Sequence, residues 1–305
     1  MSKAVSEILG YMYIFGIVMA VLAIVFVQVN TMTEDMKRSV MSQSLEQSFK
    51  KIQYIIHSVS FGEVPSQAVE IELQGGTLTL DKSDPEFIVA FVNYTETNPS
   101  NLPCGRVPNS VPLCINLSTG RLYTACTHTG YNFSACTLNH TIGKIVYRYK
   151  DWFLTLEAGS VFSKYSNQDY SKLLYEPRIL YNATLSTPGK RFLVMTIPLL
   201  DGELSIGGSG RFRFVLNEGN SNVSLISVSN LGQDFNDAYV ILRGTENKDA
   251  WCRFFERSGD VFNTTLDDTK TSYRRCSNSE NAMASIKLSN VHEIIVIFRQ
   301  VLFST

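Results

Sequence analysis

The sequence predicts an α+β fold, in which a long N-terminal transmembrane and stalk helix is followed by a mainly antiparallel, sandwich-like β head. Three observations support this prediction. The chain carries no charged residue from 8 to 32, and apolar residues then recur at helical spacing as far as Val59. After Pro65, apolar and polar residues alternate as they do in β-strands. The expected organisation is a leader at 1–4, a helix at 5–61 and a head at 62–305.

The first apolar segment, residues 8–27, is long enough to cross a membrane. An α-helix rises ~1.5 Å per residue, so about 20 residues span a hydrocarbon core of ~30 Å. A helix buried in a protein core is rarely apolar on every face, whereas this segment is. It therefore predicts a single-pass membrane anchor.

A cleavable secretory signal is the alternative, because it is also N-terminal and apolar. Such a signal has an apolar region of roughly 7 to 15 residues, followed by a small-residue cleavage site. Here the apolar run is longer, Glu7 precedes it, and Ala20 and Ala23 are followed by further Val, Ile and Phe. These features favour a helix that is retained.

The orientation of the helix is inferred from the residues that come after it. Lys3 precedes the apolar run and four basic residues follow within 37–51, which by the charge rule alone favours the opposite topology. The chain also carries six cysteines and seven Asn-X-Ser/Thr tripeptides, both typical of oxidising extracytoplasmic space. We therefore expect a cell-membrane glycoprotein with an extracellular C-terminal domain. The acceptor asparagines are Asn93, Asn116, Asn132, Asn139, Asn182, Asn222 and Asn263.

The composition is that of a globular ectodomain on an anchor. Of the 305 residues, 44% are apolar, and the net charge is -1. About 245 residues follow the helix, which is enough for a core and even for two subdomains. A near-neutral charge balance gives no reason to expect nucleic acid as a partner.

A helical rhythm continues beyond the apolar segment. No proline or glycine occurs between Ile17 and Phe61, and Gly62 and Pro65 supply a stop, so one helix is expected over 5–60. Its apolar stripe either packs on the head or meets the same helix of other subunits, and the spacing is not a strict heptad, which disfavours a coiled coil. The stripe consists of Met32, Met36, Val40, Leu45, Phe49, Ile52, Ile56 and Val59.

The head is predicted to consist of short strands separated by Gly, Asn, Asp or Pro, without a βαβ rhythm. Residues 69–73 and 78–80 alternate on either side of Gly75 and Gly76 and predict a β-hairpin. The glycine cluster at 206–210 predicts a long hairpin turn, or else a linker between two β subdomains. Further strands are expected at 87–94, 144–149, 152–158, 179–185, 191–199, 211–216, 223–228, 239–243 and 293–303.

Residues 93–141 are expected to form an irregular insert. They hold four cysteines, four of the acceptor tripeptides and four prolines, and a segment that cannot build its own core is well served by disulfides and glycans. Four cysteines allow three pairings. We expect no metal here, because Cys126 and His128 lie close but no C-x-x-C pair occurs. The expected disulfides are Cys104 with Cys114, Cys126 with Cys136, and Cys252 with Cys276.

No catalytic constellation is visible in the sequence. None of the four histidines belongs to an H-E-x-x-H motif, and no G-x-S-x-G elbow occurs. We therefore expect neither an enzyme nor a bound cofactor, although carboxylates from different strands of a β protein can converge in space.

The amino terminus, with Lys3 and Ala4 before Val5 and the apolar run, resembles archaeal type IV pilins and pilin-like proteins that carry a class III signal peptide. In that family a dedicated membrane peptidase removes a short basic leader and leaves the helix in place. The resemblance covers about 30 residues and implies cleavage between Ala4 and Val5. The helix would then stay in the membrane or enter the core of a filament, with the β head outside.

The resemblance also implies partners, namely the class III signal (prepilin) peptidase, the same or other pilin-like subunits and, for an adhesive head, surface glycans. In bacterial pilins a glutamate at the fifth position pairs with the amino terminus of a neighbouring subunit. Glu7 would be the third residue of the mature chain, so the resemblance does not assign this pairing to it. The head is larger than that of a typical major pilin. A minor pilin, a tip adhesin and a non-assembling anchored binding module are therefore alternatives to a shaft subunit. The small residues available for helix packing are Gly10, Gly16, Ala20 and Ala23.

Overall fold

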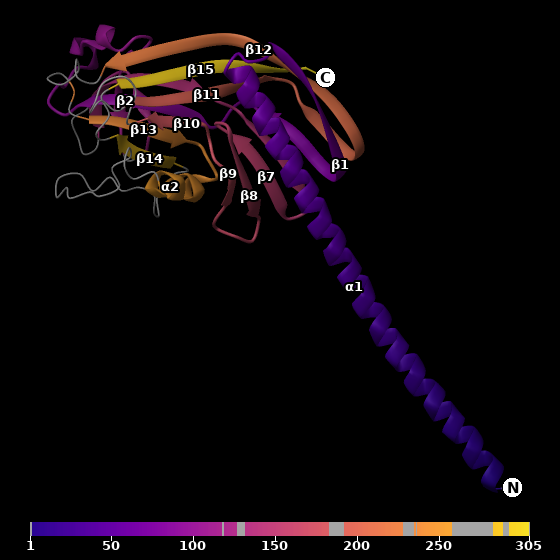
Figure 1. The fold of residues 1–305 in the computed structure, drawn as a ribbon. Helices are drawn as coiled ribbons and strands as arrows, with labels where there is room; N and C mark the ends of the chain where they lie inside the picture. The colour runs from indigo at the N-terminus through magenta and orange to yellow at the C-terminus, as the bar shows by residue number, and fades with distance from the viewer. Residues whose placement is uncertain are drawn as a thin grey trace. The chain divides into compact units, whose positions relative to one another are not determined.

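The chain begins with one long α-helix and continues into a β domain (Figure 1). The computed structural model describes residues 2–117, 119–126, 132–182, 192–227, 235, 237–257, 283–288 and 293–304, and only the backbone of 2–11, 34–35, 180–182, 192, 227 and 256–257. The chain divides into two compact units, Met1–Gln47 and Ser48–Thr305. Each unit is described by itself.

The helix α1 (Ser2–Ser60) contains 59 residues, which confirms the predicted helix and its end. Its last turn has the hydrogen bonds of a Schellman cap. The N–H of Glu63 donates to the carbonyl oxygen of Ser58, and the N–H of Gly62 donates to that of Val59, both at 3.0 Å. Gly62 has a φ of 72°, a left-handed conformation that a residue without a Cβ adopts at no steric cost.

The β domain contains two sheets, as the predicted fold class requires. Neighbouring strands are antiparallel except for β11 and β15, which are parallel. The larger sheet has the order β10 (Ile179–Asn182), β11 (Phe192–Gly202), β15 (Glu293–Ser304), β12 (Ser205–Ser227), β1 (Ser66–Asp81), β6 (Lys144–Tyr149), β7 (Trp152–Glu157), β8 (Ser160–Tyr165) and β9 (Lys172–Tyr175). The smaller sheet has the order β14 (Met283–Leu288), β13 (Asp237–Arg243), β2 (Glu86–Asn93), β5 (Asn132–Thr141), β3 (Val111–Asn116) and β4 (Leu122–Tyr123). The described helices besides α1 are α2 (Lys248–Arg257) and the 3-10 turns η1 (Pro99–Asn101) and η2 (Cys104–Arg106).

Strand β15 contributes to two cores because its buried residues change face along the strand. Its even-numbered residues as far as Phe298 lie in the core between the two sheets. Beyond that point Val301 and Phe303 are buried instead, at the alternate positions. The change of face coincides with a register irregularity in β12, between Glu218 and Ser221. The larger sheet therefore buries apolar side chains on both of its faces.

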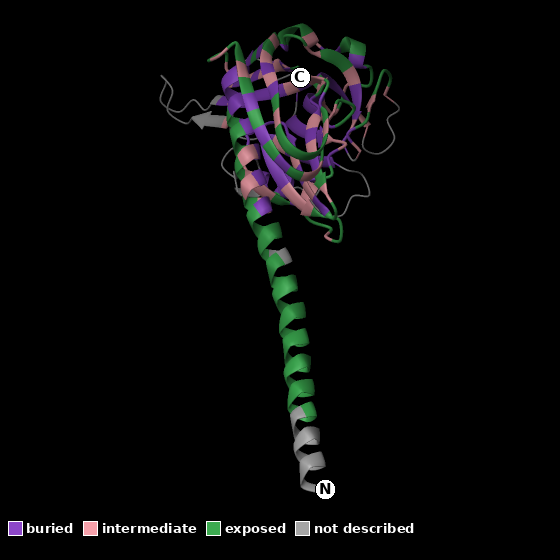
Figure 2. Ribbon diagram, turned by 90° about the vertical axis from the view of Figure 1, so that its right-hand side faces the viewer, coloured by how far each residue is buried: buried purple, intermediate pink, exposed green. Residues whose placement is uncertain are grey.

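The last turns of α1, residues 48–60, belong to the head. Gln53 Nε2 donates to the carbonyl oxygens of Gly159 and Glu176, at 2.7 and 2.9 Å. The C-terminal part of the predicted apolar stripe thus packs on the head, whereas Met32 and Met36 are exposed. Figure 2 shows the same change along the helix, from exposed residues to buried ones. The fully buried members of the stripe in this unit are Phe49, Ile52, Ile56 and Val59.

Two predicted turns are wrong, because the glycines concerned lie inside long strands. Gly75 and Gly76 do not close a hairpin; they form an irregularity in β1 with φ angles of 110° and 80°. A Cβ on Gly76 would lie 2.4 Å from the carbonyl oxygen of Arg148 on the neighbouring strand. The 206–210 cluster pairs with this same part of β1, so it belongs to β12 and joins the strands predicted at 211–216 and 223–228.

The prediction that 93–141 is an irregular insert is also wrong in part. This segment supplies β3, β4 and β5, and β5 lies between β2 and β3 inside the smaller sheet. Both faces of β5 are covered, since Ala135 belongs to one apolar cluster and Leu138 to another. A strand buried on both faces shows no alternation in its sequence, which is why periodicity missed it. Strands β8, β9 and β14 and helix α2 were not predicted from the sequence either.

Candidate functional surfaces

The apolar part of α1 is exposed on every side. Its large apolar side chains from Met12 to Val29 are between 47 and 73% exposed (Figure 2). Within the part of the chain that the structure describes, this helix is the one long and apolar enough to cross a membrane, by length and composition. An apolar surface of this extent is stable only when lipid or another protein chain covers it.

Small residues follow one another along one side of this helix. Gly16, Ala20 and Ala23 are separated by steps of four and three, which places them on the same face at ~100° per residue. A Cβ added to Gly16 would meet no atom within 4 Å. Gly10 lies roughly 120° away from Gly16 around the helix and does not extend this face. The predicted processing residues Lys3, Ala4 and Val5, together with Glu7, lie in the first turns of α1, where only the backbone is described.

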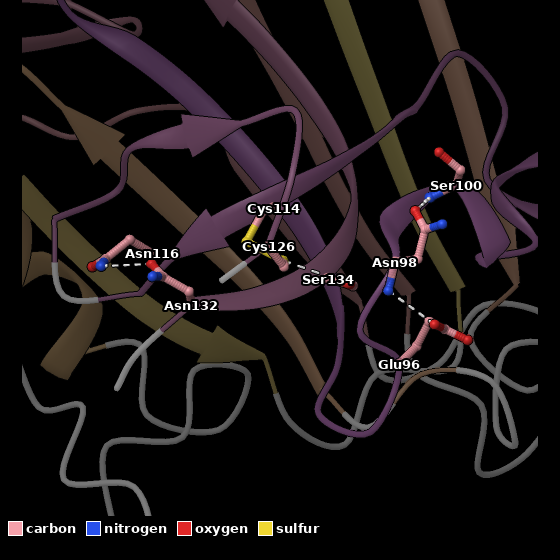
Figure 3. The surroundings of a disulfide bond; sticks show 8 residues. All are labelled: Glu96, Asn98, Ser100, Cys114, Asn116, Cys126, Asn132 and Ser134. Atoms are coloured by element: carbon pink, nitrogen blue, oxygen red, sulfur yellow. Dashed lines mark hydrogen bonds between the residues drawn. A yellow bond between two sulfur atoms is a disulfide. The ribbon is translucent and has the colours of Figure 1, made fainter. Parts of the chain in front are cut away.

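The disulfides within 93–141 differ from the predicted pairs. They join Cys104 to Cys136 and Cys114 to Cys126 (Figure 3 shows the second). The hairpin of β3 and β4 sets Cys114 opposite Tyr123, and Cys126 follows shortly, at a Cα–Cα distance of 5.2 Å. Cys136 is buried on β5 and meets Cys104 of η2 at 5.4 Å. The pairing is thus decided by strand order, which the sequence spacing does not reveal.

Two cysteines remain, Cys252 and Cys276, together with the Cys126 and His128 pair for which no metal was expected. Cys252 lies in α2 and is disulfide-bonded. Its predicted partner Cys276 lies outside the described residues, as does His128. Cys126 is committed to a disulfide and offers no thiolate. Among the described residues, no group of three or more His, Cys, Asp or Glu side chains is arranged to hold a metal ion.

Four of the acceptor tripeptides fall into two groups according to whether their third residue, Ser or Thr, is exposed or buried. At Asn93 and Asn139 the threonine at that position is exposed, and Asn139 itself is exposed. At Asn132 and Asn222 the corresponding serine is 0% and 1% exposed. The side chain of Asn182 and the whole of Asn263 lie outside the described part of the chain.

Two of the acceptor asparagines contact each other. Asn116 on β3 and Asn132 on β5 are paired in register, and Nδ2 of Asn116 donates to Oδ1 of Asn132 at 2.8 Å (Figure 3). Oδ1 of Asn116 also accepts from the backbone N–H of Thr119 at 3.0 Å. The two side chains therefore occupy one site on the surface.

The described part of the head contains several hollows, one of which has a volume of about 480 Å³. It is lined by residues of β1, β6 and β7 and by Glu246 and Asn247. A hollow of about 370 Å³ includes Asp201, Gln300 and the acceptor residue Asn222. A smaller one, of about 260 Å³, includes Glu86 and Arg243, which form an ion pair at 2.6 Å.

A buried carboxyl group that gave no signal in the sequence lies at the hollow of about 480 Å³. Glu157, the last residue of β7, is fully buried. Its Oε1 accepts hydrogen bonds from Thr245 Oγ1 at 2.5 Å and from Trp251 Nε1 at 2.9 Å. Its Oε2 makes no hydrogen bond among the described residues. Burial raises the pKa of the Glu157 carboxyl, against the opposing effects of Thr245, Trp251, Asn247 and Lys144.

These observations define a class of protein, in which a single N-terminal apolar helix carries a disulfide-bonded domain of two β-sheets. The chain belongs to the family of unknown function DUF7289, whose model matches residues 3–292. The match covers both the helix and nearly all of the β domain, so the two parts form one family architecture. No solved structure matches the chain.

Proposed function

We propose that this protein is a pilin-like surface protein of an archaeal cell, a structural or adhesive subunit of a type IV pilus-like filament. The observation that carries the proposal is the apolar helical surface from Met12 to Val29, which no part of the described chain covers. In a filament, copies of the same helix bury that surface; before assembly, lipid does. The face formed by Gly16, Ala20 and Ala23 allows close approach of two helix backbones.

The proposal is also supported by the residues before the apolar helix and by the disulfide-bonded head after it. Lys3 and Ala4 precede Val5 in the arrangement that a class III signal peptidase cleaves, by the resemblance described above. The disulfides, the exposed acceptor residue Asn139 and the exposed threonines of the Asn93 and Asn139 tripeptides suit a glycosylated head outside the cell. The role is non-catalytic, and the partners are the processing peptidase and other pilin-like subunits.

A second candidate function is a monomeric, membrane-anchored binding module. The hollow of about 480 Å³ in the head favours it, since this volume lies in the range of small-molecule sites. The two candidates differ in whether the apolar helix is covered by lipid or by other copies.

The amino-terminal residue of the protein isolated from its native cell surface is the first test. A mature chain that starts at Val5 is the expected result. An intact start at Met1 or Ser2 contradicts the processing step and leaves the anchored module. Replacing Lys3 by Gln in the precursor is expected to reduce cleavage, whereas replacing Lys37, which lies beyond the apolar segment, should not.

Cross-linking between helices tests the assembly step. All described cysteines are disulfide-bonded, so an introduced cysteine supplies a new thiol. Ala20→Cys is expected to form a disulfide-linked dimer in native membranes or filaments. Val18→Cys, about 160° away around the helix, is the matched control and should form less. Equal yields from both positions, or no dimer at all, would argue against packing through the small-residue face.

A further inference from the structure

The hollow of about 480 Å³ lies on the face of β1, β6 and β7 that is opposite their buried apolar residues. On β6, Ile145 and Tyr147 are buried, while the alternate residues Lys144 and Arg148 line the hollow. The segment that leads into α2 closes one side through Glu246. Most of the residues that line the hollow therefore stand on strands of the sheet.

Beneath the floor of this hollow lies a fully buried polar atom that has no hydrogen-bond partner among the described residues. Glu157 is held through Oε1 by Thr245 and Trp251, which fixes the carboxyl group, while Oε2 has no hydrogen-bond partner among the described residues. A buried polar atom without a partner destabilises the folded state, so the presence of this one calls for an explanation. A ligand that donates to and accepts from Oε2 would supply the missing bond.

The charges around the hollow balance, which restricts the ligand. Lys144 Nζ lies 3.6 Å from Asp81 Oδ2 and 4.0 Å from Glu246 Oε1. Arg148 adds a second positive charge. Two carboxylates thus face two cations, and burial favours the neutral form of Glu157. A metal ion or a polyanion finds no excess of opposite charge here.

The uncharged groups of the hollow are those that bind hydroxyl groups. Thr77, Thr79 and Thr155 contribute hydroxyls, and Asn247 contributes an amide. Phe153 contributes a flat apolar wall, with the Arg148 guanidinium 4.9 Å from the ring centre. A sugar ring has a rim of hydroxyls that both donate and accept, and an apolar face of C–H groups.

We propose that this hollow, which we call the Glu157 site, binds a neutral hexose or N-acetylhexosamine unit of a glycan. Oε2 of Glu157 would pair with a hydroxyl at the floor, the threonines and Asn247 would hold the rim, and Phe153 would face the C–H side of the ring. The inference does not depend on filament assembly, because every group belongs to the head.

The test uses the full chain in detergent, with the methyl glycosides of glucose, galactose, mannose and N-acetylglucosamine as probes at about 10 mM, a concentration that detects even millimolar affinity. Saturation-transfer NMR is expected to show binding of at least one probe. Thr155→Tyr keeps a residue that favours strands but fills the hollow, and should weaken binding by ~10-fold or more. Arg148→Ala, at an exposed position, should weaken it as well.

Glu72→Gln is the matched control, because Glu72 is exposed on β1 and does not line the hollow. It should bind as the natural protein does, and unchanged thermal unfolding midpoints would show that all variants are folded. Absence of transfer to all four probes would overturn the proposal, as would binding that survives Thr155→Tyr. Preferential binding of methyl glucuronide or inorganic phosphate would overturn it too, by showing an anion site. A native amino terminus at Val5 is a separate readout, so either proposal can fail alone.

Discussion

Nε2 of His57, in the last turns of α1, lies 3.2 Å from the carbonyl oxygen of Gly159, in the turn between β7 and β8. The imidazole is 4% exposed, and its Nδ1 makes no hydrogen bond among the described residues. Burial lowers the pKa of His57 to about 4; the Gly159 carbonyl opposes this effect and the positive charge of Arg178 adds to it. The end of the helix is thus held on the head by a neutral histidine.

This contact predicts that the head loses stability in mild acid. The unfolded chain takes up a proton on His57 near pH 6.5, whereas the folded chain does so only near pH 4, so the unfolded state binds more protons between these values. Stability contributed by the neutral form is complete above pH 6.5 and falls as the pH drops towards 4, by at most ~3 kcal/mol. Urea unfolding at pH 7 and pH 4.5 measures the loss. His57→Gln should reduce it, and an identical loss in that variant would contradict the assignment.

The other partner of this contact predicts a substitution that the head does not tolerate. Gly159 has a φ of 74°, and a Cβ there would lie 2.7 Å from Cε1 of His57. Gly159→Ala is therefore expected to cost about 1–3 kcal/mol of unfolding free energy, measured by urea denaturation at pH 7. Gly105→Ala is the control, because no atom lies within 4 Å of its Cβ position. Similar effects of both substitutions would show that the His57 contact is not responsible.

The observed disulfides predict unequal losses of stability. Cys104 and Cys136 close a segment of 32 residues, and Cys114 and Cys126 one of 12. By the chain-entropy account, removing the first pair with two alanines costs ~4 kcal/mol and removing the second costs ~3 kcal/mol. Urea unfolding compares the two variants. Peptide mapping without reduction checks the pairing itself, and a peptide linking Cys104 to Cys114 would refute it.

The exposure of the acceptor tripeptides predicts which of them carry glycans. Asn139 is exposed together with its threonine, so Asn139→Gln should remove one glycan mass from the protein isolated from its native surface. Asn222 is half-buried, lines a hollow and precedes a buried serine, so Asn222→Gln should change no glycan mass. Intact-protein mass spectrometry distinguishes the two outcomes.

The contact between Asn116 and Asn132 predicts that at most one of them is occupied. The amide groups lie 2.8 Å apart on adjacent strands, which leaves no room for two glycans. Glycopeptide analysis should find each molecule modified at one position or at neither. A molecule with glycans on both asparagines would show that the two strands separate there.

Features of the fold that depend on local patterns could be predicted from the amino-acid sequence. The uncharged run, the lack of proline and glycine after Ile17 and the stop at Gly62 are sufficient for one long helix with the observed end. A strand with one face covered, such as β6, alternates in sequence and was located at its observed bounds. The two-sheet, mainly antiparallel architecture followed from the number and spacing of such strands.

Features that depend on which strands become neighbours could be seen only in the folded domain. In the sequence, Gly75 and Gly76 are typical of a hairpin turn, but in the structure β12 pairs with β1 on both sides of them. The disulfide partners follow from the position of β5 in its sheet. The Glu157 site gave no signal, because its carboxyl group is buried by Trp251, which lies 94 residues away in the chain. Contacts between distant segments are set by packing of the whole domain, and local periodicity carries no information about them.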